Sequence, residues 1–163
     1  MQTRPLLICF CPGARGDFLA AVLLNMPAKV LARRQINIPL NLYTKLHPTE
    51  YDSLTGITLT DYYSIRIKLN DDDFDICASL WATKRLAWQP DTETRRTTLK
   101  IAEAAADDFT FDLTIPFKDM FSADRLAEFY FNYTKQTISE ERLNAVARGI
   151  QQQIITTTYN TVK

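Results

Sequence analysis

The turn at residues 12–18, Pro-Gly-Ala-Arg-Gly-Asp-Phe, follows a short apolar run and precedes a helical pattern. A turn of this kind directs backbone N–H groups at one point, and the positive end of the helix dipole attracts an anion to it. Glycine lets a phosphate oxygen approach the backbone closely, and Arg15 offers that phosphate a bidentate partner. Asp17 would repel a phosphate if it faced inward, so it is expected to point outward as a helix cap. A plain strand-to-helix turn is the alternative. We therefore predict an anion site at Gly13, Ala14, Arg15, Gly16, Asp17 and Phe18.

The only histidine of the chain lies in the tripeptide Lys45-Leu46-His47. Residues two apart on an extended segment face the same way, so Lys45 and His47 are expected to share one pocket. His47 would accept the proton of an attacking hydroxyl near neutral pH, while Lys45 would stabilise charge on a leaving phosphate. The alternative is a histidine with a purely structural or solvent-exposed place beside Pro48.

A second group of polar residues lies within residues 66–85. Ser79 has the basic residues Arg66, Lys84 and Arg85 near it in the sequence. A hydroxyl and several cations are partners that a second phosphate group would need. The alternative is that these residues are solvated positions on a strand end and a helix surface. We predict Ser79 as a binding residue on this basis.

Alternating strands and helices must position these residues. The apolar run Pro5–Cys11 predicts a strand buried on both faces, which is typical of a parallel sheet. Apolar residues then recur at helical spacing from Asp17 to Pro27, and alternation predicts strands at Tyr62–Leu69 and Phe109–Ile115. Strand, glycine turn and helix in this order begin a βαβ unit. The sequence thus predicts an α/β fold with a small parallel sheet flanked by helices.

Several helix starts are marked by their residue types. The run Asn70–Asp73 favours a helix N-terminus because its carboxylates complement the helix dipole. Ser122 and Ser139 are suitable caps for two helices near the C-terminus. Asp91–Thr98 is predicted to be an exposed connection that leads into the alanine-rich stretch Leu99–Ala106.

Composition narrows the function classes. The 163 residues, of which 46% are hydrophobic and 23% charged, are typical of one globular domain and exclude a largely disordered chain. Nineteen basic and 19 acidic residues give no net charge, which argues against nucleic acid or a membrane surface as a partner. Three cysteines and one histidine favour reduced thiols and no metal site. No apolar run suits a signal peptide or a membrane span, so the expected location is the cytoplasm.

The order of these motifs resembles the PAPS-dependent sulfotransferases. In that family a Pro-Lys-x-Gly-Thr-Thr-Trp-like loop binds the 5′-phosphosulfate, and residues 12–19 occupy its place here. Lys45-Leu46-His47 is similar to the family's Lys-Thr-His motif. The family then has a strand, an arginine and a helix serine that bind the 3′-phosphate; here Ser79 is present and Asp71 stands in the place of the arginine. Residues 115–120 are similar to the family's Tyr-Glu-Asp-like strand end.

This resemblance implies a single domain over residues 1–163 with a three-layer fold like that of P-loop NTPases. It implies binding of PAPS or PAP and transfer of a sulfuryl group to an acceptor hydroxyl or amine. His47 would be the base, Lys45 and Arg15 would stabilise the bridging and leaving oxygens, and residues 13–18 would bind the 5′-phosphate. Such transfer depends mainly on positioning and positive charge, and it needs no metal.

Two other function classes stay open. The first is a catalytically inactive domain that keeps the fold for binding a partner or for a structural role, which Asp17 and Asp71 favour. The second is a small nucleotide kinase. The turn lacks the Gly-Lys-Ser/Thr that holds phosphate and magnesium in ATP-hydrolysing P-loops, which weighs against the kinase. The acceptor and the oligomeric state are left open.

Overall fold

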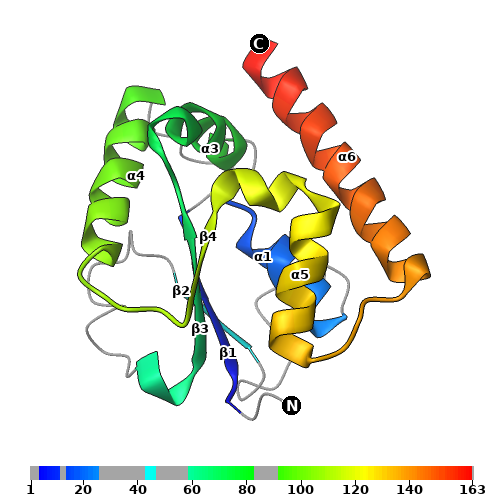
Figure 1. Cartoon of the computed structure of the whole chain (residues 1–163). Helices are drawn as coiled ribbons and strands as arrows, with labels where there is room; N and C mark the ends of the chain where they lie inside the picture. Colours follow the sequence, from blue (N-terminus) through cyan, green and yellow to red (C-terminus); the bar gives the residue numbers. More distant parts are fainter. Residues whose placement is uncertain (1–3, 12–13, 26–42, 47–58, 83–91, 163) are drawn as a thin grey trace.

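The computed structural model of the chain describes residues 4–11, 14–25, 43–46, 59–82 and 92–162 (Figure 1). Within these residues, parallel strands alternate with helices along the chain. The strands are β1 (Leu6–Cys9), β2 (Tyr43–Leu46), β3 (Tyr63–Lys68) and β4 (Leu113–Pro116). The α-helices are α1 (Gly16–Leu24), α3 (Phe74–Ala82), α4 (Thr92–Ala106), α5 (Ala123–Thr134) and α6 (Glu140–Val162), and short 3₁₀ turns lie at η1 (Leu59–Asp61), η2 (Asp71–Asp73) and η3 (Phe117–Phe121).

The described strands form one parallel sheet with the order β2-β1-β3-β4. Strand β1 pairs with β2 on one side and with β3 on the other, and the register places Cys9 beside Leu46 and Arg66. Every residue of β1 is buried, as the continuous apolar run predicts. The prediction of an α/β fold with a small parallel sheet is therefore confirmed.

Helices cover both faces of this sheet (Figure 1). Helix α4 lies on one side, α1, α5 and α6 lie on the other, and α3 lies near the end toward which the strands run. The main core joins Leu6 and Ile8 of β1 to Ile65 and Ile67 of β3 and to buried residues of the helices. Successive side chains of a strand point to opposite faces, so Leu7 and Cys9 belong to a second, smaller apolar cluster.

The predicted helix starts are confirmed at three places. The Ser122 hydroxyl accepts a hydrogen bond from the Arg125 amide at 3.3 Å, and the Ser139 hydroxyl accepts one from the Arg142 amide at 3.2 Å. Before α3, the Asp73 carboxylate accepts a hydrogen bond of 2.8 Å from the amide of Asn70. Each of these side chains satisfies backbone groups that a helix end or turn leaves without an intrahelical partner.

The predicted connection Asp91–Thr98 is wrong, because helix α4 already begins at Thr92. Its first turns contain few apolar residues, so they show no apolar stripe in the sequence. They are held to α3 by arginines instead: buried Arg95 donates from Nε to the Ala78 carbonyl at 3.1 Å, and Arg96 forms an ion pair with Asp75.

The third predicted strand, Phe109–Ile115, is also too long, because β4 begins at Leu113. Phe109 and Phe111 pack against the cluster of Leu7 and Cys9 rather than extending the sheet. No helix in the described part of the chain is both long and apolar enough to cross a membrane.

The three buried cysteines give a first prediction. Burial raises the pKa of Cys9 to about 12, although the nearby Arg66 charge acts to lower it, and burial also raises the pKa values of Cys11 and Cys77. Thiols react as thiolates, so we expect native-state alkylation at neutral pH to be at least about a hundredfold slower than that of free cysteine. Mass spectrometry after pulsed iodoacetamide labelling, with and without denaturant, measures this. Rapid native labelling of any one cysteine would contradict the described packing.

Candidate functional site

The strand order places the candidate site at the carboxyl ends of β1 and β3. From β1 the chain goes on to β2 on one side of the sheet, and from β3 it goes on to β4 on the other side. Ligands of open α/β sheets bind outside the carboxyl ends of the strands at the point where the strand order reverses. Here that point lies between β1 and β3, where the β1–α1 turn and the β3–α3 turn leave the sheet.

The β1–α1 turn ends in a strained residue. Arg15 has φ 63° and ψ 34°, a left-handed conformation that costs a residue other than glycine about 1 kcal/mol. Its carbonyl accepts hydrogen bonds from the amides of Phe18 at 3.1 Å and Leu19 at 3.2 Å, which start helix α1. Arg15 is the N-cap residue of α1 and gives the helix no side-chain cap, so the first turn leaves N–H groups for another partner.

The Arg15 guanidinium is a partly buried, and therefore partly desolvated, cation. Its Nε atom is buried and has no hydrogen-bond partner among the described residues. Burial lowers the pKa of Arg15, and the Cys77 thiol of α3 acts in the opposite direction; no described carboxylate contributes. A partly desolvated charge without a counter-ion is unfavourable, and a bound anion would relieve that cost.

Other residues of the turn are packed into the protein. Ala14 is fully buried, and its amide donates to the Cys11 carbonyl at 3.0 Å. A Cβ atom on Gly16 would lie 2.1 Å from Cδ1 of Phe10, so glycine is required there by the aromatic ring. Phe18 is half-buried and packs against Gly149 of α6. These three residues shape the turn and support its backbone.

Asp17 does not take the outward capping position that the sequence suggested. It lies half-buried inside the first turn of α1, and its Oδ1 atom is buried. Arg15, rather than Asp17, is the N-cap residue of the helix. The sign of the Asp17 charge still complements the helix dipole.

Arg66 is not available to a phosphate, contrary to its proposed place beside Ser79. It is 5% exposed and donates from NH2 to Oε2 of Glu103 at 2.8 Å and to the Glu103 carbonyl at 2.9 Å. Its NH1 atom lies 2.8 Å from Oδ1 of Asp107. Burial acts to lower the pKa of Arg66, but the bonds to these two carboxylates outweigh burial and raise it. The charge of Arg66 is therefore neutralised inside the protein.

Glu103 of α4 lies across the carboxyl ends of both central strands. Its Oε1 atom accepts a hydrogen bond from Sγ of Cys11 at 3.4 Å, and the backbone amide of Leu69 also donates to its carboxylate. Cys11 follows β1 and Leu69 follows β3, so one side chain joins the two strand ends. Burial raises the pKa of Glu103, while Arg66 acts to lower it. No local sequence pattern indicates this role, because Glu103 lies 37 positions after its partner Arg66.

The β3–α3 turn brings a group of carboxylates to the same edge. Asp73 is buried and bonded to the Asn70 amide, whereas Asp71 and Asp72 are exposed. Ser79 is a residue of helix α3. No described group of three or more histidine, cysteine, aspartate or glutamate residues is arranged to hold a metal ion.

The predicted catalytic tripeptide is placed only in part. Lys45 and Leu46 belong to β2, and Lys45 pairs with Ile8 of β1, so this segment runs beside the central strand. His47 lies outside the described residues, as do Gly13, Lys84 and Arg85. The proximity of Lys45 and His47 to the β1–α1 turn therefore stays a prediction.

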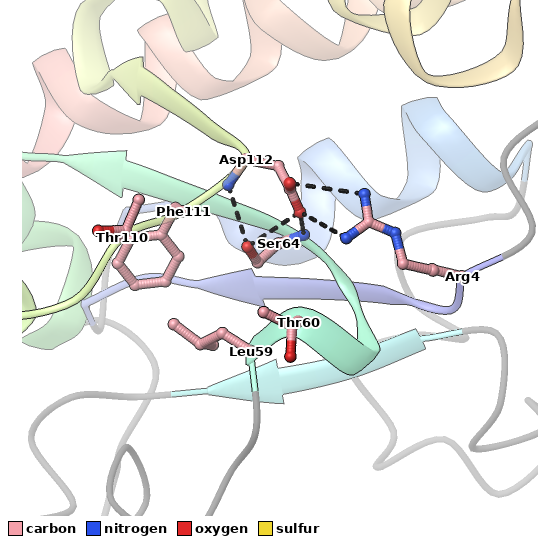
Figure 2. A pocket seen from close by; sticks show the side chains of 7 residues that line it. All are labelled: Arg4, Leu59, Thr60, Ser64, Thr110, Phe111 and Asp112. Carbon is pink, nitrogen blue, oxygen red and sulfur yellow. Dashed lines mark hydrogen bonds and ion pairs between the residues drawn. The ribbon is translucent and has the colours of Figure 1, made fainter.

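A separate pocket lies at the amino ends of the strands, where sequence reasoning placed no site (Figure 2). It has a volume of about 190 Å³ and is lined by Arg4, Leu59, Thr60, Ser64, Thr110, Phe111 and Asp112. The Asp112 carboxylate accepts from the Ser64 amide at 2.9 Å and from the Ser64 hydroxyl at 3.2 Å, and it pairs with Arg4 at 3.4 Å. These bonds fasten the start of β3 to the segment before β4, which is a structural role.

Comparison with known proteins returned no similar protein: no family model, no curated protein and no solved structure matches the chain. Its function must therefore be inferred from its own geometry. The features that bear on it are the strand order, the open helix start at Arg15 and the charges at the carboxyl edge of the sheet.

The Arg66–Glu103 pair gives the second prediction. Replacing Arg66 by Met leaves Glu103 buried without its counter-ion, so the free energy of unfolding should fall by about 3–5 kcal/mol. The double variant Arg66→Met/Glu103→Leu should be destabilised by clearly less than the sum of the two single changes. Urea denaturation followed by circular dichroism measures all three variants. Arg125→Met is the control, because that arginine forms its ion pairs at the exposed surface of α5 and should leave the midpoint nearly unchanged. Additive effects of the two single changes would contradict the described pair.

Proposed function

We propose that the chain binds the 5′-phosphate end of an adenosine nucleotide at the β1–α1 turn of a P-loop-like α/β domain. One observation carries this proposal. Arg15 is a partly buried cation without a described counter-ion, and it stands at the uncapped start of α1 beside the reversal of strand order. Helix N-termini with free N–H groups bind phosphates in many α/β proteins.

A contrast between helices supports this site. The hydroxyls of Ser122 and Ser139 cap the starts of α5 and α6 by accepting hydrogen bonds from backbone amides. In the turn before α3, the Asp73 carboxylate accepts one in the same way. At α1 the corresponding position holds a guanidinium, which cannot accept a hydrogen bond from the backbone. A phosphate bound there would accept from the free amides and from Arg15 together.

The reaction that we propose for this site is transfer of a sulfuryl group from a PAPS-type donor. The acceptor oxygen or nitrogen forms a bond to sulfur, and the bond from sulfur to the bridging oxygen of the phosphosulfate breaks. The bridging oxygen leaves on the nucleotide phosphate, and His47 takes the acceptor proton. Lys45 supports this assignment because its strand, β2, is the direct neighbour of β1. Positioning and positive charge supply most of the catalysis in such an in-line transfer.

A second candidate function is a catalytically inactive domain with a partner-binding or structural role. Glu103 favours it, because its carboxylate already occupies the ends of β1 and β3 through Cys11 and Leu69. The internal hydrogen bond of the Ala14 amide also removes one backbone donor from the turn. Binding measurements separate the two candidates.

The test is calorimetric titration with adenosine 5′-monophosphate. Charge-assisted hydrogen bonds are about twice as strong as neutral ones, so Arg15→Gly should weaken binding at least about tenfold. Glycine suits the left-handed backbone at this position, so the variant should fold with unchanged or higher thermal stability.

Arg125→Ala, on the exposed surface of α5, is the matched control and should bind like the wild-type chain. No binding, or binding that Arg15→Gly leaves unchanged, would overturn the proposed site. Either result would favour the second candidate function, a catalytically inactive domain. Tight binding of ATP that depends on magnesium would instead favour a nucleotide kinase.

A further inference from the structure

We propose that the cavity at the amino ends of the strands binds a small, neutral aromatic molecule that carries a carboxamide group. This site is separate from the β1–α1 turn, and it does not depend on the proposed function. The cavity has a volume of about 190 Å³. A cavity of roughly 150 Å³ holds one benzene ring, whereas sites for larger ligands have about 300–1,000 Å³. The volume therefore suits one ring with one substituent and is too small for a nucleotide.

Three separate segments of the chain build this cavity, and hydrogen bonds hold them together. Arg4 precedes β1, the segment from η1 to β3 contributes Leu59, Thr60 and Ser64, and Asp112 precedes β4. The Ser64 amide and hydroxyl donate to the Asp112 carboxylate at 2.9 and 3.2 Å, and Arg4 pairs with the same carboxylate at 3.4 Å. The cavity is therefore formed before a ligand enters, and binding has to order little of the chain.

Apolar side chains form one part of the cavity. Leu59 and Phe111 lie there, and both are half-buried (Figure 2). They also pack against the buried cluster of Leu7 and Cys9, so the interior of the protein fixes their positions. A ligand ring that packs against Leu59 and Phe111 removes apolar surface from water, which supplies most of the binding energy.

The polar part of the cavity carries two opposite charges that neutralise each other. Asp112 and Arg4 form an ion pair there, beside Ser64 (Figure 2). An anionic ligand would be repelled by the Asp112 carboxylate, and a cationic ligand would be repelled by the Arg4 guanidinium. A charged ligand would also lose hydration on entering the cavity. A neutral ligand avoids both costs.

The Asp112 carboxylate keeps an acceptor position for the ligand. Its Oδ2 atom accepts from Ser64 and lies 3.4 Å from Arg4, whereas the described bond at Oδ1 is a long one of 3.5 Å from Arg4. An ionised carboxylate has about four acceptor positions, so a ligand N–H can donate to Oδ1. The exposed hydroxyls of Thr60 and Thr110 also line the cavity and can donate to a ligand carbonyl. A carboxamide combines this donor and this acceptor in one neutral group.

Four single-ring ligands of nearly equal shape test the proposal in a fluorine nuclear magnetic resonance titration. They are para-fluorobenzamide, para-fluoroacetophenone, which keeps the carbonyl and lacks the N–H, the anion para-fluorobenzoate and the cation para-fluorobenzamidinium. We expect the benzamide to bind with a dissociation constant on the order of 1 mM or below. It should bind at least about fivefold more tightly than each of the other three. Shifts of the ¹⁵N-labelled backbone amides of Ser64 and Asp112 should accompany binding and locate it.

The variant Asp112→Asn tests the acceptor position. It removes the charge and keeps the size of the side chain, so para-fluorobenzamide should bind about three- to tenfold more weakly. The affinity for para-fluoroacetophenone should stay within about twofold of that of the wild-type chain, which shows that the cavity is intact. Glu128→Gln is the matched control, because it removes a carboxylate that also pairs with an arginine, Arg125, on the exposed surface of α5. It should change neither affinity, and thermal denaturation checks the fold of both variants.

Each contrary outcome overturns a stated part of the proposal. The absence of shifts at Ser64 and Asp112 with all four ligands would overturn the site. Equal affinities of the four ligands, or tighter binding of the benzoate or the benzamidinium, would overturn the ligand class. Benzamide binding that Asp112→Asn leaves unchanged would overturn the role of the carboxylate. None of these results bears on the β1–α1 turn, whose nucleotide binding the Arg15→Gly titration tests.

Discussion

The buried ion pair between Arg66 and Glu103 is the interaction on which the functional edge of this protein depends. A strand residue and a helix residue bring opposite charges into the largely apolar interior of the protein. Such a pair tolerates burial only when its remaining donors and acceptors are satisfied. Here Asp107, Cys11 and the Leu69 amide satisfy most of them, although Nε of Arg66 is buried without a described partner, and one network joins α4 to the carboxyl ends of β1 and β3.

In the proposed function, this network would limit where a ligand binds. Because the Glu103 carboxylate bonds to groups that follow both β1 and β3, an anionic ligand would be left with the backbone of the β1–α1 turn and with Arg15. The strained backbone of Arg15 and its unpaired Nε atom are both costs to the free protein. A phosphate would offset the second of them.

Much of the fold could be predicted because its signals are local. The apolar run of β1, the alternation of β3 and the caps Ser122 and Ser139 all depend on neighbouring residues in the sequence. The start of α4 could not be predicted, since Arg95 helps hold it through a carbonyl 17 positions away. The assignment of Arg66 to a phosphate was wrong for the same reason. Its partners, Glu103 and Asp107, lie 37 and 41 positions away in the sequence. Arg15 was identifiable from the turn motif, but that no described residue supplies its counter-ion is visible only in three dimensions.

The measurement that tests the central claim most directly is a nuclear magnetic resonance titration of the ¹⁵N-labelled chain with adenosine 5′-monophosphate. The account predicts saturable shifts of the backbone amides of Gly16 and Asp17, at the uncapped start of α1, and of the Arg15 Nε–H, because a bound phosphate would contact these groups. The amides around the second pocket, at Ser64 and Asp112, should stay unchanged. Shifts confined to that pocket, or no shift at Arg15 on saturation, would contradict the account.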